Sequence, residues 1–229
     1  EGMGLLPDGD EELRAEDDAS VQQRYRGAEV SWTLTEAVHT RAIWFVAAGS
    51  LLQTMASGGI AFLMPSYFQD TGMSTQVAAA GASAFLLGGA ASATLWGFLT
   101  EHYDERDLVA FATATAMFLA LGGRFVTEPV GALMFAALYG ATTRGEGALV
   151  MMMLAAYYGR RSYGTISGFA NTFTLMGLGL GPFIYSRVLD NNGSQYAAVF
   201  YLSTALLAVA TVLMWSAKRP TRKPQPNTT

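Results

Sequence analysis

The chain has 229 residues, of which 51% are hydrophobic and only 14% are charged, a composition typical of a polytopic membrane protein. Its net charge of −4 comes largely from acidic residues near the N-terminus, and the basic residues form no stripe, which argues against a nucleic-acid partner. The absence of cysteine excludes disulfides, thiolate catalysis and Cys-ligated metals, and the two histidines lie far apart, so we expect neither a metal site nor a cofactor.

The two ends of the chain are polar. Residues 1–30 are acidic and lack aliphatic periodicity, which predicts a flexible segment outside the membrane. Residues 31–41 predict an amphipathic interfacial helix, in which Thr33 and Glu36 have the spacing of a capping box. Residues 218–229 form a basic, proline-rich tail.

Between these ends, residues 42–217 predict an all-α membrane bundle, because long charge-poor runs alternate with short polar connections. We expect Pro65 to stop the first span and Pro182 to kink the fifth or perturb its end. Asn191 to Gly193 predict a turn outside the membrane. The six predicted transmembrane helices cover about 42–64, 77–99, 108–126, 130–156, 164–186 and 196–217.

Two charges near the middle of the fourth span are the main candidates for a functional site. At about 1.5 Å per residue, the apolar segment from Val130 to Ala156 is roughly 40 Å long, enough to cross a bilayer with some tilt. Arg144 and Glu146 would then lie near the midplane, where a charge costs at least ~2.5 kcal/mol. Such residues face protein or water, and they are functional candidates by default.

Helical geometry separates these two charges. Residues at i and i+2 point about 200° apart, so Arg144 and Glu146 cannot pair with each other unless the helix opens. Gly145 and Gly147 make such an opening conceivable, because glycine tolerates nonhelical backbone. Without it, each charge needs a partner on another helix.

Polar residues in two other spans are further candidates for substrate binding. Gln53, Thr54 and Ser57 lie close to one face of the first helix, where they either line a cavity or bond to a neighbouring helix. The fifth span contributes Asn171 and Thr174.

The basic residues fix the expected orientation. By the positive-inside rule, both termini of the chain and the two basic connections are cytoplasmic. Only Arg124 and Arg187 fall near the other side. The residues on the cytoplasmic side are Arg14, Arg24, Arg26, Arg41, Arg106, Arg160, Arg161, Lys218, Arg219, Arg222 and Lys223.

Two connections carry recognisable motifs. The run from Gly97 through Glu101 to Arg106 resembles the G-x-L-a-D-r-x-G-r-r loop between the second and third helices of each half of a major facilitator superfamily transporter. The run from Tyr158 to Gly168, with Gly159, Arg160 and Arg161, is similar to the Y-F-G-R-R-x-x-G-x-I-x-G stretch of the oxalate/formate antiporter and monocarboxylate carrier branch. Residues 4–9 and 33–44 resemble the loop that joins the two halves, so the resemblance covers nearly the whole chain.

The resemblance implies a fold. The six spans would be helices seven to twelve, one half-bundle of a twelve-helix carrier, and the N-terminal six-helix half would be missing. The substrate cavity of such carriers lies between the halves near the midplane, and the fourth span would line it. The family's gating loops map onto Gly97, Glu101, Arg106, Gly159, Arg160 and Arg161.

The leading functional hypothesis is a secondary active transporter, an antiporter in the cell or inner membrane, that moves a small organic solute by alternating access. A carboxylate is the favoured solute, because the planar guanidinium of Arg144 suits a carboxylate, and the resemblance to the monocarboxylate carrier branch implies a monocarboxylate. A desolvated carboxyl such as Glu146 could carry a proton. Alternatively, both residues are ion-paired and only hold helices together.

Other functions remain as alternatives. A drug-efflux or sugar carrier is the main rival, and a non-transporting receptor or scaffold is a further one. We expect no enzyme, because the sequence offers no nucleophile, metal site or paired acid and base.

Overall fold

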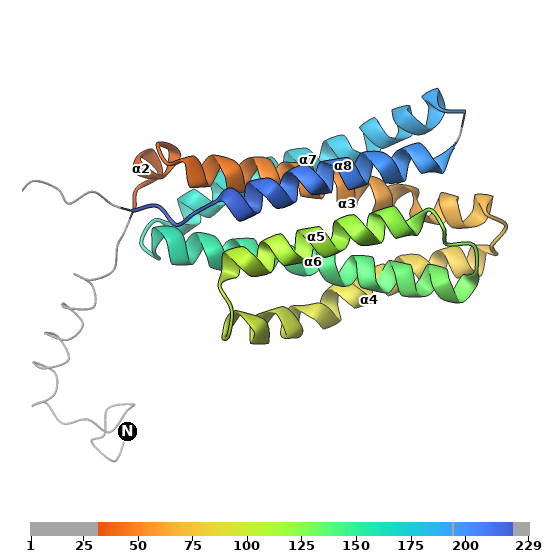
Figure 1. Ribbon diagram of the computed structural model, residues 1–229, viewed down its shortest axis with the longest axis horizontal. Coiled ribbons are helices and arrows are strands. Elements are labelled where there is room, and N and C mark those ends of the chain that lie inside the picture. Colours follow the sequence, from red (N-terminus) through yellow and green to blue (C-terminus); the bar gives the residue numbers. More distant parts are fainter. Residues whose placement is uncertain (1–31, 194, 222–229) are drawn as a thin grey trace, which may run out of the picture.

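The computed structural model describes residues 32–193 and 195–221, so the expectations for residues 1–31 and 222–229 lie outside the described chain. The described residues are helical, and their helices lie largely side by side (Figure 1). The helices are α2 (Leu34–Val38), α3 (Arg41–Asp70), α4 (Thr75–Thr100), α5 (Glu105–Gly123), α6 (Pro129–Tyr158), α7 (Tyr163–Asn191) and α8 (Tyr196–Ser216).

Helices α3 to α8 alternate in direction, so their connections gather at two ends of the bundle (Figure 1). We call these the Tyr158 end and the Pro129 end, after the last and first residues of α6. The Tyr158 end contains the α4–α5 and α6–α7 connections, and α8 finishes there. The predicted cytoplasmic connections therefore share one end.

The short helix α2 has the predicted capping box. The backbone N–H of Thr33 donates to Glu36 Oε2 at 2.8 Å, and the backbone N–H of Glu36 donates to Thr33 Oγ1 at 3.3 Å. Two backbone N–H groups at the start of the helix, which have no partner within the helix itself, obtain side-chain acceptors in this way. The segment is also tied to α6, since the Trp32 N–H donates to the Tyr158 carbonyl at 3.1 Å. The capping-box prediction is confirmed.

The expectation that Pro65 stops the first membrane helix was wrong. Helix α3 passes through Pro65 and continues to Asp70. Proline removes one backbone hydrogen bond, whereas ending the helix there would leave several carbonyl groups without partners in apolar surroundings. The helix ends instead at Thr71 and Gly72, where Gly72 has a φ of 89° and the Thr71 hydroxyl donates to the Tyr67 carbonyl at 2.9 Å.

Pro182 likewise lies inside a helix, and α7 runs nine residues beyond it to Asn191. The turn predicted at Asn191 to Gly193 follows directly, and Gly193 has a φ of 62°. Helix α6 is continuous through Gly145 and Gly147, so the opening that these glycines would permit is not present.

Close helix contacts depend on small residues. A Cβ atom on Gly88 of α4 would collide with the Ala137 carbonyl of α6, and one on Gly140 of α6 would collide with the Phe85 backbone of α4. A Cβ atom on Gly177 or Gly181 of α7 would likewise collide with backbone atoms of α3. Small residues in α4, α6 and α7 therefore let these helices approach one another closely.

Two apolar clusters form the core, one toward each end of the bundle. On α6, the cluster at the Pro129 end reaches Tyr139, and the cluster at the Tyr158 end begins at Leu149. The buried polar residues of α3, α4, α5 and α6 fall between the two clusters along each helix. We call them the polar layer; they are Ser50, Gln53, Ser92, Thr113, Thr142, Thr143 and Glu146.

The outer surface of the bundle is apolar. Large side chains such as Leu87, Phe118 and Phe183 are more than half exposed. Helices α3, α4, α5 and α8 are long and apolar enough to cross a membrane. Helices α6 and α7 have comparable lengths of 30 and 29 residues but fall short of the same hydropathy. These features are typical of a protein whose surroundings are lipid rather than water.

Candidate functional site

A cavity of about 220 Å³ borders the polar layer between α3, α6 and α7. It contains five of the seven residues that the sequence suggested for substrate binding, from three separate helices. Its remaining lining residues are Ser50, Gly147, Val150 and Met151. The five predicted residues are Gln53, Thr54, Glu146, Asn171 and Thr174.

Hydrogen bonds between the helices hold the walls of this cavity. The amide of Gln53 donates from Nε2 to the Thr143 carbonyl of α6 at 3.1 Å. The hydroxyl of Thr54 lies 2.9 Å from the Thr174 carbonyl of α7 and 2.6 Å from the Ser50 carbonyl of its own helix. Thus Gln53 links α3 to α6, and Thr54 links α3 to α7.

Glu146 lies on the inner side of the cavity and is 2% exposed. The side chains of Thr113 on α5 and Gln53 on α3 face its carboxyl group. Its Oε2 atom has no hydrogen-bond partner among the described residues, and neither does the hydroxyl of Ser50, which borders the same cavity. Buried polar atoms without partners are rare, so both atoms need an explanation.

Arg144 lies on a different side of α6 from Glu146. Its side chain is exposed, and the guanidinium carbon is 5.2 Å from the centre of the Phe85 ring of α4. In the described part of the chain, Arg144 has no ion-pair partner. The prediction that Arg144 and Glu146 point to different sides of a continuous helix is confirmed, and the two side chains form no ion pair.

Ser57 is the other predicted residue outside the cavity. Its hydroxyl donates to the Thr54 carbonyl of its own helix at 3.4 Å. A hydroxyl group in a helix commonly bonds to a preceding carbonyl in this way. Ser57 is not among the residues that line the cavity.

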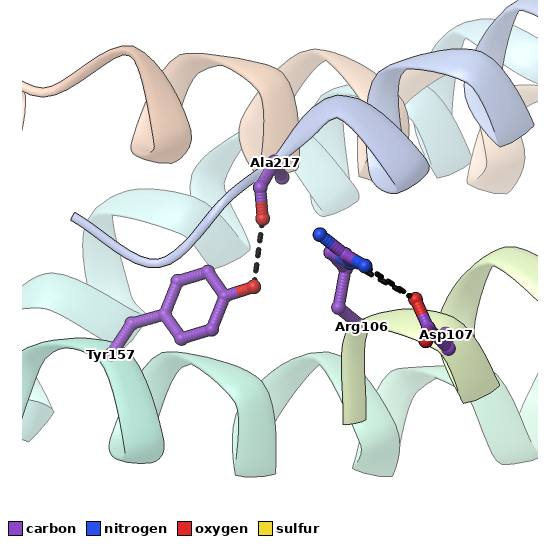
Figure 2. A network of polar contacts seen from close by, with 4 residues as sticks. All are labelled: Arg106, Asp107, Tyr157 and Ala217. Atoms are coloured by element: carbon purple, nitrogen blue, oxygen red, sulfur yellow. Dashed lines mark hydrogen bonds and ion pairs between the residues drawn. The ribbon is translucent and has the colours of Figure 1, made fainter. Parts of the chain in front are cut away.

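A second cavity, of about 180 Å³, lies at the Tyr158 end and has a polar lining. Figure 2 shows part of its wall: the hydroxyl of Tyr157 donates to the Ala217 carbonyl at 2.7 Å, and Arg106 pairs with the neighbouring Asp107 at 2.8 Å. The Tyr157 hydrogen bond connects α6 to the end of α8, whereas the Arg106–Asp107 pair lies within α5. The lining residues are Asp104, Glu105, Arg106, Ala156, Tyr157 and Arg219.

The residues of the two motif loops gather at this same end. Gly97 is in the last turn of α4, and Glu101 follows the end of that helix. Gly159 ends α6 with a φ of 77°, and Arg160 and Arg161 are exposed in the connection that follows. Of these residues, Arg106 alone lines the second cavity.

Sequence reasoning missed Ser50 and Arg219, which line the two cavities, and Thr113, whose side chain faces Glu146. Ser50 precedes Gln53 by three residues, so the same helical face could have included it. Thr113 gave no signal, because an isolated threonine in an apolar helix usually bonds to its own backbone, as Thr113 does to the Val109 carbonyl at 2.8 Å. Arg219 is more than 100 residues from Arg106 in the sequence, and the residues around Arg219 gave no sign that the two line one cavity.

The fold and the mid-bundle cavity together define a helical membrane protein with a polar site between its helices. The family model of the Major Facilitator Superfamily matches residues 46–229. The chain therefore belongs to the Major Facilitator Superfamily, a family of membrane transporters. No curated protein gives a significant match to the sequence.

Family membership confirms the coarser part of the sequence interpretation. The protein is an integral membrane protein of a transporter family, whose partners are the lipid bilayer and a small-molecule solute. The all-helical structure fits a half-domain of this family. Membership also supports the expectation that the protein is not an enzyme.

Proposed function

We propose that the protein is the C-terminal half of a secondary active transporter that moves a small organic solute by alternating access. The observation that supports this function best is the cavity between α3, α6 and α7, which is lined by Glu146 and five neutral polar side chains near the middle of long helices. Transporters of related design bind solute and coupling ion near the bilayer midplane, where helices from both halves meet.

The proposal includes six membrane-spanning helices, α3 to α8, and a further six-helix half that completes the solute path. Helix α3 contributes Ser50, Gln53 and Thr54 to the cavity, α6 contributes Glu146, and α7 contributes Asn171 and Thr174. A membrane helix can carry polar side chains where it faces protein or a cavity. The other half would cover the exposed face of α6 that includes Arg144.

Arg144 is the basis for proposing a carboxylate solute, and with it the oxalate/formate antiporter and monocarboxylate carrier branch. An exposed guanidinium without an ion-pair partner can bind a carboxylate through two parallel hydrogen bonds. Antiport across a cell or inner membrane would follow from that branch. The cytoplasmic position of both chain termini rests on the basic residues at the Tyr158 end.

A sugar or other uncharged solute is the second candidate, and the cavity lining favours it. Among the lining residues the one ionisable group is the carboxyl of Glu146, while Arg144 lies outside the cavity. Amide and hydroxyl groups such as those of Gln53, Asn171 and Thr174 suit the hydroxyl groups of a neutral solute.

The substitution Arg144→Gln separates the two candidates. For a carboxylate carrier, we expect flux into proteoliposomes containing the full-length carrier to fall by at least about tenfold, as for the loss of one charge-assisted hydrogen bond. The matched control is Arg187→Gln. Arg187 is also exposed and lies over an aromatic ring, that of Phe183 at 5.4 Å, but it is near the end of α7.

Three outcomes are informative. A loss of flux in Arg144→Gln but not in Arg187→Gln supports an anion site at Arg144. Unchanged flux in both variants would refute the carboxylate proposal and favour a neutral solute. The absence of any solute-dependent flux in the wild-type full-length protein would refute transport itself.

A further inference from the structure

Two residues that line the cavity between α3, α6 and α7 each have a buried oxygen atom without a hydrogen-bond partner among the described residues. They are Ser50 Oγ on α3, in a residue that is 4% exposed, and Glu146 Oε2 on α6, in a residue that is 2% exposed. Both residues line the same cavity. An unsatisfied polar atom in such a place costs roughly 1–3 kcal/mol, and more when it carries a charge.

A proton on Glu146 does not remove this cost. Protonation would turn Oε2 into a donor, and a donor needs an acceptor within hydrogen-bond distance. Ser50 Oγ has no hydrogen bond to Oε2 or to any other described atom, so it does not supply that acceptor. A group that can contact both oxygens from within the cavity would satisfy both.

The remaining polar groups of the wall are also rich in oxygen. Gln53 uses its Nε2 to bond the Thr143 carbonyl, which leaves its Oε1 as an acceptor. The Thr54 hydroxyl donates its proton to a backbone carbonyl, which leaves its oxygen as an acceptor as well. Asn171 and Thr174 add side-chain oxygens from α7. These groups surround one carboxylate, and no lysine, arginine or histidine is among the lining residues.

We propose that this cavity is a binding site for a monovalent cation, either a sodium ion or the ammonium group of a solute. The carboxylate of Glu146 supplies the charge, and Ser50, Gln53 and the polar residues of α7 supply neutral oxygens. Oxygen atoms are the ligands that hard cations prefer, and one carboxylate balances one positive charge. Neutralisation also removes the cost of an unpaired charge inside the membrane.

The site rests on the proposed transport function for its role, but it can be tested by binding alone. The thermal stability of the purified full-length protein in detergent is measured while sodium chloride replaces choline chloride at constant ionic strength and pH. A ligand that binds the folded state raises the melting temperature as its concentration rises above Kd. We expect sodium to raise the melting temperature of the wild-type protein, or methylammonium to do so if the ligand is an ammonium group.

Three variants define the site. Glu146→Gln is nearly isosteric and should abolish the response to the cation, because it removes the charge. Ser50→Ala removes one neutral oxygen and should raise the half-maximal cation concentration by several-fold. The matched control is Ser92→Ala. Ser92 is 5% exposed, but its hydroxyl already donates to the Gly89 carbonyl at 2.9 Å and does not line the cavity. Its response should equal that of the wild-type protein.

Each outcome decides the proposal. A response to sodium identifies the ion, and a response to methylammonium alone identifies a solute amine. No response to either cation in the wild-type protein would overturn the site, as would a response that both Glu146→Gln and Ser50→Ala retain. If Glu146→Gln does not fold, the half-maximal cation concentrations of Ser50→Ala and Ser92→Ala are compared instead. Equal values in these two variants would overturn the site.

The same measurements keep this proposal separate from the transport function. Solute-dependent flux without any cation response would refute the cation site and leave transport intact. A cation response in a protein that moves no solute would support the site and refute the proposed function.

Discussion

At the scale of single residues, the polar layer depends on side chains that bond to the backbone of another helix. Trp96 of α4 donates from its indole N–H to the Ala141 carbonyl at 2.9 Å, and Gln53 of α3 donates to the Thr143 carbonyl at 3.1 Å. Both acceptors belong to the stretch of α6 just before Arg144. Two neighbouring helices therefore fix the position of the segment that carries both charges.

The substitution Gln53→Leu tests this link. It keeps the approximate volume of the side chain but removes the hydrogen bond to α6. We expect it to lower the free energy of unfolding by about 1 kcal/mol, as for other hydrogen bonds between membrane helices. Chemical denaturation of the purified protein would measure this change. The control is Thr172→Val, at an exposed residue of α7 whose hydroxyl bonds only within its own helix among the described residues. Equal stability in both variants would refute the role of Gln53.

At the scale of helices, the sequence predicted the order of the elements well and their ends less well. Periodicity and apolar length predict where helices lie, whereas the end of a helix depends on contacts that a sequence does not show. Pro65 was expected to stop a helix, but the cost of one missing hydrogen bond is smaller than that of ending α3 early. Gly72 and Gly159, with positive φ, mark the true ends.

The contact between α4 and α6 gives a prediction at this scale. Gly140→Val would drive a side chain into the Phe85 backbone, which cannot move aside as a flexible side chain could. We expect a loss of roughly 1–3 kcal/mol or more in the free energy of unfolding. The control is Gly131→Ala on the same helix, where the nearest atom to the new Cβ is 3.9 Å away. Thermal unfolding of the two variants checks the difference, and a Gly140→Val protein as stable as Gly131→Ala would contradict the tight contact.

At the scale of the whole molecule, part of the candidate site could be predicted from the sequence. Helical spacing put Gln53 and Thr54 on one face, and the angle between i and i+2 separated Arg144 from Glu146. Which helices adjoin one another could not be predicted, so the meeting of Asn171 with Glu146 at one cavity came only from the structure. Ser50 was missed because a lone serine is usually satisfied by its own helix.

The six-span topology can be tested by labelling, because these 229 residues contain no cysteine. Single cysteines replace His102 and Arg161 at the Tyr158 end, and Thr71 and Asn192 at the Pro129 end; all four residues are exposed. With an impermeant maleimide on intact cells, we expect labelling of the Thr71 and Asn192 positions only. Labelling of His102→Cys and Arg161→Cys instead would reverse the orientation, and one labelled position from each end would contradict six spans.

The two apolar clusters have an electrical consequence for a protein in a membrane. Along the helix axis, they separate the polar layer from both aqueous phases, since one cluster lies toward each end of the bundle. Moving one charge across 100 mV of membrane potential changes its energy by about 2.3 kcal/mol, so even a narrow water-filled path would conduct ions. We therefore expect the two apolar clusters to keep water and ions from reaching Glu146 along the helix axis.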